Sequence, residues 1–138
     1  DVFTKEDVRV LDWKRYAIPL GFKMQLPKHL AAVIQPRSGM SVKGMHAKRM
    51  CDGGLIKEMR IDADVKLGLI DSGYTGEVKA IVKTYGIGGF LPGDIIIPAG
   101  TKIAQMRIVE IPATVLVEGW IDKDTERGEG GFNSSGVK

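Results

Sequence analysis

Short apolar runs rich in Val, Ile and Tyr, separated at short intervals by Pro, Gly or Asp, constrain this chain more than any other feature. Regularly spaced short strands with turn signals between them are typical of an all-β barrel or jelly roll. The best helix candidate is short, about 42–50; it contains Gly44 and is ended by Asp52-Gly53-Gly54. The predicted strands are 8–11, 16–20, 29–34, 66–70, 78–83, 94–97, 103–109 and 114–120.

Composition narrows the class of protein. The 138 residues predict one domain with a single core, and 43% hydrophobic residues fit a globular protein. No apolar run approaches the roughly 18 residues that cross a membrane, and a net charge of +3 is mild for a nucleic-acid binder. We therefore expect neither a membrane nor a nucleic-acid partner. A single cysteine, Cys51, excludes an intrachain disulfide and fits a reducing, cytoplasmic setting.

The stretch Gly68-Leu-Ile-Asp-Ser-Gly-Tyr-Thr-Gly-Glu77 places a carboxylate, Asp71, where an apolar strand enters a turn. One aromatic residue, Tyr74, stands between the turn glycines. A carboxylate beside a ring that can hold a flat ligand is one way to present a hydrolytic base. Asp, Ser and Gly are also ordinary turn residues, so this stretch alone leaves a plain hairpin open.

Three further segments carry polar groups suited to phosphate. Gln35-Pro-Arg-Ser-Gly-Met40 places a guanidinium, a hydroxyl and a flexible backbone at a strand end, and the Arg fork matches phosphate oxygens. Gly100-Thr-Lys-Ile-Ala-Gln105 offers one amide side chain. The glycine-rich end reads as a disordered terminus, yet its Arg127, Phe132 and Ser134-Ser135 also suit a nucleoside phosphate.

A basic segment lies between these motifs. Its interpretation as a solvated loop competes with a patch for a partner or nucleic acid. Its basic residues are Lys43, Lys48, Arg49, Lys57 and Arg60.

In this order the segments resemble four of the five motifs of the trimeric deoxyuridine triphosphatase (dUTPase) family. The first motif, an Ala-Gly-Tyr-Asp-Leu-like segment, is not visible; Asp1, 35 residues before Pro36, matches its aspartate, with the preceding strand absent from this sequence. The stretch from Gly39 to Gly68 is longer than usual for the family, and Asn133 replaces a commoner glycine. These departures indicate a divergent, phage-type member.

The resemblance implies a dUTPase-like distorted jelly-roll or β-clip barrel with at most one short helix, assembled as a homotrimer with shared active sites. Residues 1–126 would form the barrel and 127–138 a flexible glycine-rich lid. It also implies hydrolysis of dUTP to dUMP and pyrophosphate in the cytoplasm, or in the host cytoplasm if the protein is phage-encoded. Asp71 would activate water for attack on the α-phosphate. Mg²⁺ would bind the triphosphate, and Asp1 would hold it through a water molecule.

Ligand contacts follow from the same resemblance. Phosphates would be bound by Arg37, Ser38, Gly39, Gln105, Arg127, Ser134 and Ser135. Uracil and deoxyribose would be bound by Val65, Leu69, Ile70, Tyr74, Lys79 and Phe132, with Tyr74 excluding a 2′-hydroxyl, Phe132 stacking on the base and backbone groups reading uracil.

Other functions remain open at this point. The related dCTP deaminase family has Pro-Gly-Trp-x-Gly at the turn and a glutamate in the next strand, where this chain has Tyr74 and Ile81. A nucleotide-sensing regulatory binder could use the same pocket, with residues 40–60 facing a protein partner. A structural capsid-like jelly roll would have no need of Arg37, Asp71, Arg127 and Phe132 in these contexts.

Overall fold

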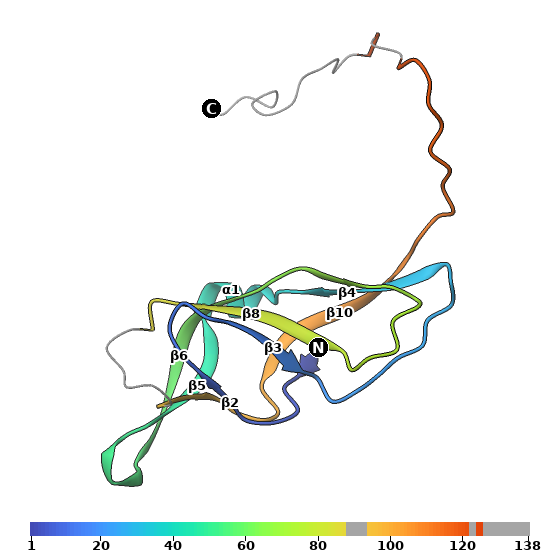
Figure 1. Cartoon of the computed structure of the whole chain (residues 1–138). Helices are drawn as coiled ribbons and strands as arrows, with labels where there is room; N and C mark the ends of the chain where they lie inside the picture. The colour runs from blue at the N-terminus through green and yellow to red at the C-terminus, as the bar shows by residue number, and fades with distance from the viewer. Residues whose placement is uncertain (88–93, 122–123, 126–138) are drawn as a thin grey trace.

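The computed structural model describes residues 1–87, 94–121 and 124–125, which form two antiparallel sheets (Figure 1). One sheet has the order β1 (Val2–Phe3), β10 (Lys102–Glu110), β4 (Leu30–Gln35), β7 (Gly68–Ile70). The other has the order β2 (Val8–Val10), β9 (Ile95–Ile97), β5 (Met45–Met50), β6 (Ile56–Val65), β8 (Lys79–Tyr85), β3 (Arg15–Pro19). The helical elements are α1 (Ser38–Lys43) and the 3-10 turn η1 (Asp52–Gly54).

Alternate side chains of the strands point inward, as the period of two in a β-strand requires. Every second residue is buried in the second half of β6 and along β8. The inward side chains of both sheets meet in one apolar cluster, which includes Ile18, Ile34, Met45, Val82, Ile95, Ile97 and Ile103. The prediction of an all-β protein with at most one short α-helix is therefore confirmed for the described residues.

Seven of the predicted strands overlap observed ones, and the eighth, 114–120, is wrong. No strand pairs with residues 111–121, which extend away from the two sheets (Figure 1). Leu116 and Trp120 are fully exposed. An apolar run with β propensity forms a strand only where a neighbouring strand accepts its backbone hydrogen bonds, and the described part of this chain offers none there.

The predicted helix at 42–50 is largely wrong, because α1 ends at Lys43 and β5 follows directly. Gly44 separates them with a φ of 79°, which stops the helix. After it, Met45 and Ala47 are buried on one face of β5, and β5 pairs with β6 from Met45↔Ile61 to Met50↔Ile56. The segment expected to be a solvated loop is thus mostly a regular β-hairpin.

The only α-helix in the described ranges has six residues, so no described helix is long and apolar enough to cross a membrane.

Gly44 leads to a stability prediction. A Cβ at this position would lie 2.9 Å from the carbonyl oxygen of Ile61, in addition to the cost of a positive φ. We expect Gly44→Ala to lower the free energy of unfolding by about 3 kcal/mol, the sum of backbone strain and overpacking. Urea unfolding followed by circular dichroism measures this change.

Gly53→Ala is the reference variant, because Gly53 has a positive φ of 74° with ψ 12° and a Cβ there meets nothing within 4 Å. It measures the cost of a left-handed residue without a clash, about 1–2 kcal/mol, whereas Gly44, with ψ 166°, also lies in a region open almost to glycine alone. Equal losses in the two variants would show that the approach of Ile61 to Gly44 has no energetic weight.

Candidate functional site

The β4–β10 ladder gathers polar residues from three distant parts of the chain. Gln105 lies opposite Gln35 in the register, and its Nε2 donates to the Pro36 carbonyl over 3.1 Å. Arg37 Nε donates to Asp1 Oδ1 over 2.9 Å, and Lys102 Nζ lies 3.6 Å from Asp1 Oδ2. Asp1, Arg37, Lys102 and Gln105 are therefore neighbours, and we call this cluster the cationic end of the β4–β10 ladder.

Arg37 stands at the boundary between β4 and α1. Its backbone is extended, with φ −98° and ψ 133°, and its carbonyl accepts the amides of Met40 and Ser41. Arg37 Nη1 also donates to the Lys102 carbonyl over 3.4 Å, so the guanidinium is held on two sides. Ser38 and Gly39 follow it and are exposed, which leaves the segment after Pro36 accessible to a ligand.

Asp71 and Tyr74 occupy a tight turn after β7. The Tyr74 amide donates to the Asp71 carbonyl over 3.0 Å, and the Tyr74 hydroxyl donates to the Glu77 carbonyl over 2.9 Å. The phenol ring lies over Gly76, where a Cβ would collide with it. The Asp71 carboxylate is exposed, and the Tyr74 ring is 44% exposed. The turn thus presents a carboxylate beside a ring in a defined orientation.

One chain does not bring these two groups of residues together. In the β4–β7 ladder Ile70 lies opposite Ala32, so Asp71 follows at the Ala31 end of β4. Arg37 lies five residues beyond Ala32 in the other direction, about 16 Å away along an extended strand. Within one chain Asp71 and Arg37 therefore lie toward opposite ends of β4.

The predicted uracil and deoxyribose contacts are spread over both sheets. Leu69 and Ile70 lie in β7, which is an edge strand among the described residues because it pairs with β4 alone. Val65, at the end of β6, is buried, with 4% of the residue exposed. Lys79 is exposed at the start of β8, opposite Pro19. These contacts stay predictions.

The tail residues Arg127, Phe132, Ser134 and Ser135 lie outside the described residues, and so does the proposed lid at 127–138. Their roles also stay predictions. The last described strand, β10, ends at Glu110.

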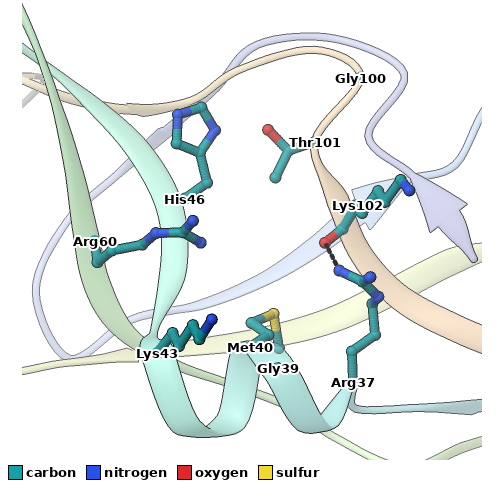
Figure 2. Close-up of a pocket in the computed structure, with 9 residues that line it drawn as sticks. All are labelled: Arg37, Gly39, Met40, Lys43, His46, Arg60, Gly100, Thr101 and Lys102. Atoms are coloured by element: carbon teal, nitrogen blue, oxygen red, sulfur yellow. Dashed lines mark hydrogen bonds between the residues drawn. The ribbon is translucent and has the colours of Figure 1, made fainter.

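Sequence reasoning did not find a pocket of about 370 Å³ beside the cationic end (Figure 2). Basic residues in the 40–60 segment were visible, but only the β5–β6 pairing shows which of them face Arg37. The pocket is lined by Arg37, Gly39, Met40, Lys43, His46, Arg60, Gly100, Thr101 and Lys102.

One acidic side chain of the hairpin, Glu58, pairs with two of its basic residues beside this pocket. Glu58 hydrogen-bonds His46 and lies 3.2 Å from Lys48 Nζ. The hydrogen bond with His46, supported by Lys48, holds the pKa of the Glu58 carboxyl below its ordinary value. Glu58 therefore stays ionised down to lower pH than a free glutamate. Within the described ranges no three His, Cys, Asp or Glu side chains are grouped to hold a metal ion.

Comparisons with known proteins bear on this arrangement. The dUTPase family profile matches residues 54–136. Deoxyuridine 5'-triphosphate nucleotidohydrolase of Clostridium kluyveri is 37% identical over 137 residues, covering 99% of this chain and 82% of that protein. The enzyme of the same name from Paramecium bursaria Chlorella virus 1 is 34% identical over 140 residues, with coverages of 99% and 82%.

Solved structures show the same fold. A mutant dUTPase of Staphylococcus bacteriophage 80alpha with dUpNHpp aligns with a TM-score of 0.73 at 23% identity, covering 99% of this chain and 85% of that one. A mutant dUTPase from phage phi11 of S. aureus, described for its coordination of a structural Mg(II) ion, aligns with a TM-score of 0.65 at 21% identity, with coverages of 88% and 84%.

The turn after β7 gives a prediction on Tyr74. We expect Gly76→Ala to displace the phenol ring and break its hydrogen bond to the Glu77 carbonyl, because the added Cβ occupies the space of the ring. The Tyr74 ring resonances in an NMR spectrum report the displacement. Gly73→Ala is the control, since a Cβ there meets nothing within 4 Å. Unchanged Tyr74 resonances in Gly76→Ala would contradict the ring position described.

Proposed function

The chain belongs to the dUTPase family and is a hydrolase that acts on dUTP; from this premise, we propose that each active site is built by several copies of the chain. One copy gives Arg37, Ser38, Gly39 and Gln105, and another gives Asp71 and Tyr74. The observation that carries the proposal is the placement of Asp71 and Arg37 toward opposite ends of β4. A homotrimer with shared sites, as the family resemblance implies, satisfies this geometry.

Asp71 acts as the general base. No ion pair or side-chain hydrogen bond engages its carboxylate within the described part of the chain. An ionised carboxylate only accepts hydrogen bonds, so it can orient a water molecule and take its proton during attack on the α-phosphorus. The oxygen of that water bonds to phosphorus while the bond to the bridging oxygen breaks, which yields dUMP and pyrophosphate.

The cationic end of the β4–β10 ladder binds the phosphate chain. Arg37 is already oriented by Asp1 and by the Lys102 carbonyl, so little side-chain freedom is lost when an anion binds. Preorganised donors of this kind stabilise the charge that develops on a leaving pyrophosphate. Gln105, fixed on the Pro36 carbonyl, adds an amide next to them. Arg127, Ser134 and Ser135 would close the clamp from the tail.

The turn after β7 selects the nucleoside. Tyr74 is held by the Glu77 carbonyl and packed on Gly76, and a fixed ring against the sugar leaves no room for a 2′-hydroxyl. The edge of β7 offers backbone donors and acceptors at Leu69 and Ile70 that can read uracil. Cytosine presents a donor where uracil presents an acceptor, which leaves a buried group unpaired. Phe132 would stack on the base.

Magnesium fits the Asp1 carboxylate through a water molecule. The two Asp1 oxygens each face one cation, Arg37 or Lys102, and keep lone pairs for a water on the metal. A hard cation that retains several waters and takes phosphate oxygens suits this arrangement better than a protein cage. When bound, Mg²⁺ would neutralise charge on the triphosphate.

The substrate profile tests the function. We expect the full chain with dUTP and Mg²⁺ to release pyrophosphate, with much weaker release from dCTP, dTTP or UTP. Separate assays of pyrophosphate and ammonia distinguish hydrolysis from deamination. Ammonia release from dCTP would replace this function with the deaminase, and tight dUTP binding without product would favour a nucleotide sensor.

Mixing two inactive variants tests the shared site. Asp71→Asn and Arg37→Gln are each expected to lose nearly all turnover, while Asp71→Asn still binds dUTP. After denaturation together and refolding, random assembly places an intact Arg37 opposite an intact Asp71 at about one site in four. Recovered dUTP turnover in the mixture, against none in either variant refolded alone, is the expected result. No recovery, although the copies mix, would place the complete site within one chain.

A further inference from the structure

Cationic side chains from two distant parts of the chain converge on the pocket in Figure 2. Lys43 enters from the last turn of α1 and Arg60 from β6, whereas Arg37 faces them from the cationic end and the Lys102 ammonium points away from them, toward Asp1. Arg60 and Lys43 belong to the segment between Gly39 and Gly68, which lies outside the motif residues predicted to bind phosphate. The β5–β6 hairpin therefore adds a wall to the phosphate region.

The charges on that wall are not neutralised. Arg37 and Lys102 share Asp1, but Lys43 and Arg60 form no ion pair with a carboxylate in the described ranges. Arg60 Nη1 donates to the Gly44 carbonyl over 3.3 Å, which orients the guanidinium and leaves its other donors available. Glu58 is engaged by His46 and Lys48. Three permanently cationic side chains, Arg37, Lys43 and Arg60, thus point into the pocket, and of these only Arg37 is paired with a carboxylate, Asp1, in the described ranges.

Backbone geometry holds this wall in place. The register sets His46 opposite Arg60, and Gly44 turns the chain from α1 into β5 with a conformation that favours glycine. Because the Gly44 backbone passes against Ile61 and also accepts the Arg60 hydrogen bond, α1, β5 and β6 keep Lys43 and Arg60 on one side of the pocket. The Arg60 guanidinium is therefore oriented by its bond to Gly44, and the end of α1 places Lys43 on the same side of the pocket.

We propose that this pocket is a pyrophosphate subsite, in which Arg60 and Lys43 bind the two terminal phosphates of the substrate and then the released pyrophosphate. The inference rests on the proposed function, because Arg37 and Gly39 line both the pocket and the phosphate-binding segment. The pocket has no Phe, Tyr or Trp to stack on a base, and its guanidinium and ammonium groups match the bidentate and point-charge recognition of phosphate.

The kinetic consequence follows from when these contacts exist. Contacts to the terminal phosphates are present in bound substrate and persist in bound pyrophosphate. They therefore strengthen ground-state and transition-state binding alike, and their loss raises KM with a smaller effect on kcat. Pyrophosphate that occupies the same pocket competes with dUTP. Both effects depend on Arg60 and Lys43 and not on the general charge of the hairpin.

The experiment measures pyrophosphate binding to the full chain by isothermal titration calorimetry, and dUTP kinetics with added pyrophosphate. Arg60→Gln and Lys43→Gln are each expected to weaken pyrophosphate binding about tenfold, the factor for one lost charge-assisted hydrogen bond. We expect KM for dUTP to rise by a similar factor and kcat to change less than about twofold. Arg60→Lys, which keeps the charge, should recover part of the affinity.

Lys57→Gln is the matched control, because Lys57 is exposed on the same strand as Arg60, loses the same charge and does not line the pocket. Equal weakening by Lys57→Gln would reduce the effect to long-range electrostatics and overturn the proposal. So would unchanged affinity in both pocket variants. Should Arg60→Gln fail to fold, Lys43→Gln and Arg60→Lys decide the matter, since neither removes a contact to a carboxylate.

Two further readings separate this inference from the function on which it rests. Inorganic phosphate is expected to bind much more weakly than pyrophosphate; equal affinities would identify a single-anion site and overturn the subsite. If the unmodified chain releases no pyrophosphate from dUTP, the function fails, yet titration with pyrophosphate still tests Arg60 and Lys43. If dUTP is hydrolysed but the affinity for pyrophosphate is unchanged in both the Arg60 and Lys43 variants, the function is supported and the subsite is refuted.

Discussion

The antiparallel pairing of β4 is the constraint on which the rest of the structure depends. On one side β10 brings Gln105 and Lys102 to the end of β4, where Arg37 and Asp1 complete a cationic cluster. On the other side β7, which like β10 is antiparallel to β4, ends with Ile70 opposite Ala32, so Asp71 follows at the far end. Because strand register is set by backbone hydrogen bonds and by which face is buried, this separation is a rigid property of the sheet.

In the proposed function, that separation links catalysis to assembly. Under the proposed function, the base and the phosphate-binding residues lie toward opposite ends of β4, about 16 Å apart along the strand, and would meet across an interface between copies. A closed symmetric oligomer then repeats the same junction at every site. In this arrangement the backbone groups along the free edge of β7, which are unpaired among the described residues, would bind the nucleobase at the interface.

The sequence predicted most of the strands and the motif residues at the cationic end, because apolar runs and turn residues are local signals. It failed at 42–50 and at 114–120 for a common reason. Each run has local propensity for the state expected of it, but Gly44 and the partner strand β6 convert the first to a strand, while the absence of a described partner leaves the second unpaired. The local sequence pattern does not show which strand, if any, will pair with a segment.

The sequence by itself determined the chemistry of this protein: a carboxylate and an aromatic ring in one turn, an Arg-Ser-Gly segment after a strand, and an amide in a later strand. Only the tertiary structure decided which of these groups are neighbours. It joined Asp1 to Arg37, kept Asp71 apart from both, and brought basic residues of the 40–60 segment together as one wall of a pocket beside Arg37. The physical reason is that side-chain chemistry is encoded residue by residue, whereas distance depends on strand register and hairpin pairing between segments far apart in the chain.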